Sequence, residues 1–332
     1  MEETKPKSAV GLILRGMSMG VAEVIPGVSG GTIAFITGIY ATLLNSIKSV
    51  NYNLIKLLFK GKVASVYAQL NGRFLLFLLM GMAVGMVFGV FFISHLLETT
   101  PEPLWGFFFG LVLASVGYMW IQITSFKVNY IFLFVVGAVL SYLVTTLTPA
   151  GGNASLPFVF FSGAIAISAL ILPGISGSFI LLLLGMYGII IPEVKTVLSN
   201  PNSESLVLVG VFGLGCLTGL LSFSRILSYT FKHFADATLA ALTGIMLGSL
   251  PKIWPWRNPS LLLDKETGKN IVPDLSSFQF SDLENAKLLK ETNVMPAGYF
   301  TEPRTLITAV AFIIGIALIY AAYRFQKSET MT

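Results

Sequence analysis

The chain has 332 residues, of which 55% are hydrophobic and only 11% carry a charge. A soluble domain has about a quarter charged residues, so this composition excludes a soluble globular protein and indicates an integral membrane protein. One cysteine, Cys216, and two histidines exclude a disulfide framework and leave too few ligands for a transition-metal site, so we expect no metal and no cofactor. The net charge of +5 lies mostly in loops, where it signals membrane topology and not nucleic-acid binding.

The first apolar region, about residues 9–48, is interrupted by the stretch VAEVIPGVSGGTIAFITGIY, Val21–Tyr40. Pro26 and Gly27 are expected to end one helix, and Ser29 can cap the N-terminus of the next. This predicts two half-helices of roughly 15–20 residues each, shorter than or equal to one bilayer span. We interpret the region as a re-entrant hairpin, which dips into the bilayer and returns to the side from which it came.

Six uninterrupted apolar segments follow, each close to the length of about 20 residues that a spanning helix needs. They are Arg73–Leu97, Trp105–Ile123, Tyr130–Leu147, Leu206–Phe231, Thr238–Trp254 and Thr305–Phe325. A second interrupted region, about 157–198, lies between the third and the fourth of them. It breaks at Pro173 and Gly174, with Ser176 as the expected cap, and predicts a second re-entrant hairpin.

The two hairpin regions are copies of one sequence. At an offset of 147 residues, 10 of the 34 positions in 15–48 are identical in 162–195: Gly16, Ala22, Pro26, Gly27, Ser29, Gly30, Ile33, Gly38, Tyr40 and Lys48. Downstream, Gly85–Leu97 resembles Gly215–Leu227, and Gly110–Ser115 resembles Gly244–Ser249. The sequence thus predicts an all-α protein of two repeats, 1–150 and 151–332, each a hairpin plus three transmembrane helices. An odd number of crossings in each copy predicts that the two have inverted topology.

The lysines and arginines predict the orientation. They are concentrated before the first hairpin and in the loop after it, and they return at Lys127, Lys232, Arg324 and Lys327. By the positive-inside rule both termini are expected in the cytoplasm. The polar insertion 251–304 then falls outside. Its Ser281 and Glu284 have the spacing of a capping box, which predicts a surface helix over NAKLLK.

The two helix breaks are the candidate binding site. Each second half-helix begins at Ser-Gly, so its free N–H groups and its positive dipole end are directed at the bilayer midplane. Inversion makes the two tips face each other, and converging helix N-termini favour an anion, usually phosphate. Alternatively, the breaks only allow close helix packing. The candidate substrate-binding residues at the tips are Pro26, Gly27, Ser29, Gly30, Gly31, Thr32, Pro173, Gly174, Ser176, Gly177 and Ser178.

Four charged or titratable residues lie within or beside the apolar segments, where such groups are functional candidates. Arg15 and Glu23 are about two turns apart in the first hairpin. They either neutralise each other, or Arg15 binds an anionic headgroup and Glu23 carries a proton. Arg225 is a second candidate phosphate partner, because its guanidinium binds oxyanions with two donors, and His95, at the matching position, is a second coupling candidate. For Arg225 and His95 the alternative is an interfacial anchor.

The stretches AEVIPGVSGGTIAFITGIY and LILPGISGSFILLLLGMYG resemble the paired signatures of bacterial polyprenyl-phosphate transporters. The resemblance spans nearly the whole chain, although the insertion 251–304 does not fit the family pattern clearly. It implies a flippase that returns undecaprenyl phosphate from the outer to the inner leaflet of the cytoplasmic membrane for envelope synthesis. The phosphate would bind between the tips while the prenyl chain stays in lipid, with possible coupling to a proton or another ion.

Two other functions remain open. A channel or exchanger for inorganic anions also uses helix N-termini to bind its ion. A polyprenyl-diphosphate phosphatase would need a nucleophile with a base, or clustered carboxylates with a metal. Glu23 is the only carboxylate in either hairpin core and no histidine accompanies it, so we expect no enzyme activity.

Overall fold

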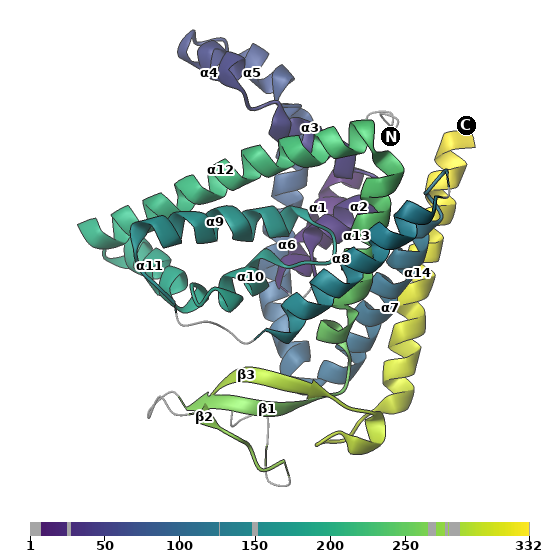
Figure 1. Ribbon diagram of the computed structural model, residues 1–332. Helices are drawn as coiled ribbons and strands as arrows, with labels where there is room; N and C mark the ends of the chain where they lie inside the picture. The colour runs from purple at the N-terminus through teal and green to yellow at the C-terminus, as the bar shows by residue number, and fades with distance from the viewer. Residues whose placement is uncertain are drawn as a thin grey trace.

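The computed structural model describes residues 8–331 except 25–27, 126, 148–151, 265–269, 276–277 and 279–285. The described chain is mostly helical, and a small sheet lies at the end of the molecule opposite to both termini (Figure 1). Before residue 150 come α1 (Ala9–Val24), α2 (Gly30–Ile36), α3 (Tyr40–Lys48), α4 (Tyr52–Phe59), α5 (Val63–Gln69), α6 (Gly72–Thr99), α7 (Pro101–Trp120) and α8 (Val128–Thr146). After it come α9 (Leu156–Ile171), α10 (Gly177–Leu183), α11 (Tyr187–Ser199), α12 (Ser203–His233), α13 (Ala235–Ser249) and α14 (Thr305–Met331).

The helices are those of a multi-pass membrane protein. Among the described residues, α6, α7, α8 and α12 are by length and composition able to cross a membrane. The other two expected spans are shorter. α13 has 15 residues and continues into a 3-10 turn, η1 (Leu250–Ile253), and the apolar part of α14 is Thr305–Ala321.

Each hairpin also has a bend that the sequence analysis did not predict. The chain bends by 117° between α2 and α3 and by 112° between α10 and α11. Gly38 and Gly185, which match at the offset of 147, adopt the left-handed conformation there, with φ of 66° and 69°. The Ile39 N–H donates to the Ala34 carbonyl at 2.9 Å, the bond that closes a Schellman motif, and α10 ends with the equivalent bond. The expected half-helices of 15–20 residues are therefore wrong for the second half of each hairpin.

Glycines allow each hairpin to pack closely on the long helix that follows it. A Cβ built on Gly85 of α6 would lie 2.1 Å from the Met17 carbonyl oxygen of α1. A Cβ on Gly219 of α12 would lie 2.3 Å from the Ala164 carbonyl oxygen of α9. The same contact thus occurs in both halves of the chain, at positions where any side chain would collide with backbone.

These contacts correct the alignment of α6 with α12. The residue numbers of Gly85 and Gly219 differ by 134, whereas the sequence match of Gly85 with Gly215 used a difference of 130. The earlier alignment is wrong by four residues, about one helical turn. His95 is therefore not the structural counterpart of Arg225.

The remaining helices pack across the two halves. A Cβ on Gly110 of α7 would lie 2.2 Å from the Phe312 carbonyl oxygen of α14. In the other half, a Cβ on Gly244 of α13 would lie 2.0 Å from the Phe134 carbonyl oxygen of α8. α7 and α13 are the second long helices of their halves, so each packs on the third helix of the other half.

The insertion after η1 forms a sheet of β1 (Arg257–Asp264), β2 (Asn270–Ile271) and β3 (Ala286–Asn293), in the order β2-β1-β3. β3 is antiparallel to β1, and the buried Leu262 lies opposite Leu288. The expected helix over NAKLLK is wrong, because Ala286–Lys290 belong to β3, and Ser281 and Glu284 lie outside the described residues. Pairing with a distant strand overrides the local capping pattern, and the chain is not all-α.

We predict that Gly110→Ala lowers the free energy of unfolding by about 1–3 kcal/mol, because the added methyl group collides with backbone. The measurement is the midpoint of thermal unfolding in detergent, which should fall. The control is Gly117→Ala on the same helix, where a Cβ meets nothing within 4 Å. Equal midpoints for the two variants would contradict the close packing of α7 on α14.

Candidate functional site

The first break is closed by its own side chains. The Gly30 N–H donates to Oε1 of Glu23 at 2.8 Å, and the Gly31 N–H donates to Oγ of Ser29 at 3.1 Å. All seven residues of α2 are buried. Thus the first two backbone donors of α2 are occupied within the protein. Pro26 and Gly27 lie outside the described residues.

The two breaks touch each other. The Ser29 hydroxyl lies 3.3 Å from the Leu170 carbonyl oxygen and 3.2 Å from that of Leu172, at the end of α9. The Tyr40 hydroxyl donates to the carbonyl oxygen between them, that of Ile171, at 3.0 Å. A Cβ on Gly31 would lie 2.6 Å from the same Ile171 oxygen, so a larger residue would force the breaks apart.

A further bond runs in the opposite direction. The Gly174 N–H, in the second break, donates to the hydroxyl of Thr32 at 3.0 Å. Gly174 has a φ of 87° and follows the buried Pro173. Side chains of the first hairpin thus form hydrogen bonds with carbonyl groups and with one N–H group of the second break.

The second break is organised differently from the first. Ser176, at the N-cap of α10, pairs its hydroxyl with that of Ser178 at 2.8 Å and does not cap the helix, whereas Ser29 caps α2. A Cβ on Gly177 would lie 2.6 Å from the Ala166 carbonyl oxygen. Packing inside the hairpin therefore already requires glycine at this position, as the packing interpretation of the breaks expects.

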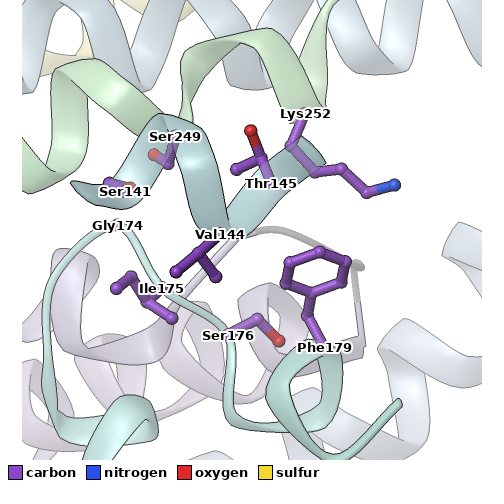
Figure 2. A pocket seen from close by; sticks show the side chains of 9 residues that line it. All are labelled: Ser141, Val144, Thr145, Gly174, Ile175, Ser176, Phe179, Ser249 and Lys252. Carbon is purple, nitrogen blue, oxygen red and sulfur yellow. The ribbon is translucent and has the colours of Figure 1, made fainter. Parts of the chain in front are cut away.

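The second break also lines a recess, whose other walls come from α8, α13 and η1 (Figure 2). The recess is small and partly open at its mouth. Lys252 reaches over the ring of Phe179, with Nζ 5.2 Å from the ring centroid, and Ser176 lies below them in this view. Sequence reasoning missed Lys252. The available signal was a lysine directly after an apolar helix.

The structure does not gather the predicted charged residues at the breaks. Glu23 contacts the first break, through its bond with the Gly30 N–H. Arg15 Nη1 donates to the Gly11 carbonyl within α1, at 3.2 Å. Arg225 Nη2 donates to the Val50 carbonyl just after α3, at 2.5 Å, and therefore holds the end of the first hairpin. His95 is exposed on α6.

Comparison with known proteins identifies the family. Residues 19–271 match the VCA0040-like family, described as undecaprenyl phosphate translocase-like. The chain belongs to this family. The match includes both PGxSG motifs and ends inside the insertion, which confirms the resemblance seen in the sequence.

Two relatives share another name. The polyprenyl-phosphate transporter of Vibrio cholerae serotype O1 is 42% identical over 306 residues, which cover 91% of this chain and 94% of the relative. The polyprenyl-phosphate transporter of Staphylococcus aureus is 31% identical over 258 residues, 73% of this chain and 85% of the relative. No solved structure matches the chain. The relatives are named as transporters, which agrees with the expectation that this chain is not an enzyme.

We predict that Tyr40→Phe destabilises the protein by about 1–3 kcal/mol, because the buried Ile171 carbonyl loses its donor. Thermal unfolding in detergent measures the change. The control is Tyr187→Phe, the equivalent position at the offset of 147, where the side chain is exposed. If both variants unfold like the wild type, the contact between the breaks does not contribute to stability.

Proposed function

We propose that this chain transports undecaprenyl phosphate from the outer to the inner leaflet of the bacterial cytoplasmic membrane. The proposal rests on one observation, the contact between two helix breaks amid apolar helices, in a chain whose relatives are named polyprenyl-phosphate transporters. A prenyl chain is apolar and can stay in the hydrocarbon core of the bilayer, so only the phosphate needs a polar path. Backbone groups at helix breaks supply such a path where protein or a wet cavity receives them.

The architecture that we propose is a pair of inverted repeats, 1–150 and 151–332, each with a re-entrant hairpin and three spans. Matched glycine contacts in the two halves support it, as does the exchange of the third helices. Both termini lie at one end of the molecule and the sheet at the other (Figure 1), in agreement with cytoplasmic termini and an external insertion. Transport would proceed by rocking of one repeat against the other around the breaks.

The phosphate would be handled by the polar groups of the two breaks. In the present conformation the first break is closed, because Glu23 and Ser29 occupy its donors, while the second lines a recess. This asymmetry supports a state in which the headgroup meets the second break first. The recess is lined by Lys252, which pairs with Glu291 of the sheet, and we assign the sheet end to the outside (Figure 1).

Glu23 would couple transport to a proton. Its carboxylate accepts the bond from Gly30 that a phosphate oxygen would otherwise accept. Two anions on one donor repel, so a phosphate can replace the carboxylate only when Glu23 leaves or takes up a proton. His95, the other coupling candidate, stays a prediction, as do the phosphate contacts of Arg15 and Arg225.

We predict opposite labelling of the two ends by an impermeant thiol reagent in intact cells, on a Cys216→Ala background. Lys60→Cys, in the turn between α4 and α5, should react only after the cells are permeabilised. Ser199→Cys and Lys290→Cys should react from outside without permeabilisation. Labelling of all three from one side would contradict the inverted repeats.

We predict that the protein in liposomes moves a short-chain prenyl phosphate out of reach of an impermeant phosphatase added outside. Glu23→Gln should still move the lipid but lose the dependence of the rate on a pH gradient, because the neutral amide cannot carry the proton. The control is Glu204→Gln, an exposed carboxylate in the first turn of α12, which should behave like the wild type.

The same liposomes test the other functions. Movement no faster than in empty liposomes would contradict the proposed transport. Chloride flux in its place would assign an anion channel, and release of phosphate from a prenyl diphosphate would assign a phosphatase. Unchanged pH dependence in Glu23→Gln would leave transport standing and remove Glu23 from the coupling.

A further inference from the structure

The recess beside the second break has a positively charged rim. Lys252 Nζ lies 3.4 Å from Oε2 of Glu291 in β3, and Arg257 Nη1 lies 3.1 Å from the same oxygen. Among the described residues, two cations therefore share one carboxylate here, which leaves an excess positive charge at the mouth. The long contact to Lys252 is the weaker of the two by distance.

Of the two cations, Lys252 is the one available to a ligand. Arg257 is held by a bond to the Lys252 carbonyl at 2.6 Å and by the ring of Trp105, 4.3 Å from its guanidinium carbon. The Arg257 side chain is 9% exposed and that of Lys252 is 27% exposed. Lys252 is also the one that lines the recess.

A buried hydroxyl in the recess lacks a partner. Ser141 of α8 is 2% exposed, lines the recess, and has no hydrogen-bond partner for its Oγ among the described residues. A buried hydroxyl without a partner is destabilising, and a bound acceptor removes that penalty. Ser176, from the second break, adds a second hydroxyl to the wall.

We propose that this recess is an oxyanion site, in which the Lys252 ammonium pairs with a phosphate monoester and the Ser141 and Ser176 hydroxyls donate to it. Glu291 is the internal counter-ion that the ligand displaces from Lys252. Val144, Ile175 and Phe179 add apolar surface to the wall, as suits a phosphate on an apolar chain. The lipid identity of the ligand rests on the proposed function, and the oxyanion site itself does not.

The test is equilibrium binding to the full-length protein in detergent, measured by tryptophan fluorescence or calorimetry. The probes are farnesyl phosphate, farnesol and inorganic phosphate. We expect farnesyl phosphate to bind, farnesol to bind at least ten-fold more weakly, and high salt to weaken only the charged probes. Inorganic phosphate that binds as tightly as farnesyl phosphate would keep the site but assign it to free phosphate.

Four variants give the site a signature that a structural role does not. Lys252→Gln should weaken farnesyl phosphate binding by about ten-fold or more, the effect of losing a charged partner. Ser141→Ala should weaken it by about two- to ten-fold without lowering the unfolding midpoint, since that hydroxyl has no partner to lose among the described residues. Glu291→Gln should strengthen binding, because it frees Lys252. Lys290→Gln, an exposed lysine next to Glu291, is the control and should change nothing.

The outcomes separate the site from the proposed function. Wild-type affinity in folded Ser141→Ala and Lys252→Gln overturns the site, even if transport continues. Binding that depends on Lys252 without transport in liposomes keeps the site and overturns the function. If Lys252→Gln does not fold, the opposite effects expected for Ser141→Ala and Glu291→Gln still decide, and unchanged or equal shifts in both overturn the site.

Discussion

Backbone polar groups at the two helix breaks must find partners inside an apolar bundle, and the rest of the structure depends on how they do so. An unsatisfied group in lipid costs several kcal/mol, so such breaks persist only where protein or water receives them. Here the hydroxyls of Ser29 and Tyr40, in the first hairpin, donate to carbonyl oxygens at the end of α9. The hydroxyl of Thr32 accepts a hydrogen bond from an N–H of the second break. Each hairpin is therefore incomplete without the other, and segments far apart in the chain are fixed together at this point.

The hydrogen bonds divide the two breaks into unlike halves. In the first, the Glu23 carboxylate accepts from the Gly30 N–H, where an anionic ligand would otherwise bind, and the helix that follows, α2, is buried. In the second, the hydroxyls of Ser176 and Ser178 bond to each other, and the break opens onto a recess with Lys252 at its rim (Figure 2). For a carrier that must receive an anionic headgroup on one side and release it on the other, one closed and one open break is the expected resting asymmetry. In the proposed transport, Glu23 would keep the closed break from binding an anion until the carboxylate is displaced.

Local patterns in the sequence were sufficient for much of the fold. Runs of apolar residues located the long helices, and Pro26 and Pro173 located the breaks, because proline and glycine act on the backbone next to them. The bends at Gly38 and Gly185, between α2 and α3 and between α10 and α11, had a signal in the sequence. These matched glycines were not interpreted as helix ends. The helix expected over NAKLLK was wrong since its partner strand, β1, lies well before it in the chain. The long-helix alignment was wrong by one turn because identities alone do not reveal which glycine faces a backbone.

By itself the sequence determined the membrane class, the repeat, the helix breaks and the family, since all of these depend on composition or on residues close together in the chain. Only the tertiary structure decided which groups meet. It joined Ser29 and Tyr40 to carbonyls more than 130 residues away, and it placed Arg225 at the end of α3 instead of at the breaks. It also placed Lys252, Ser141 and Ser176, which are far apart in the chain, in the wall of one recess. The reason is physical: a buried polar group takes whichever partner the packing of helices brings near it, and that packing is set by the whole chain at once.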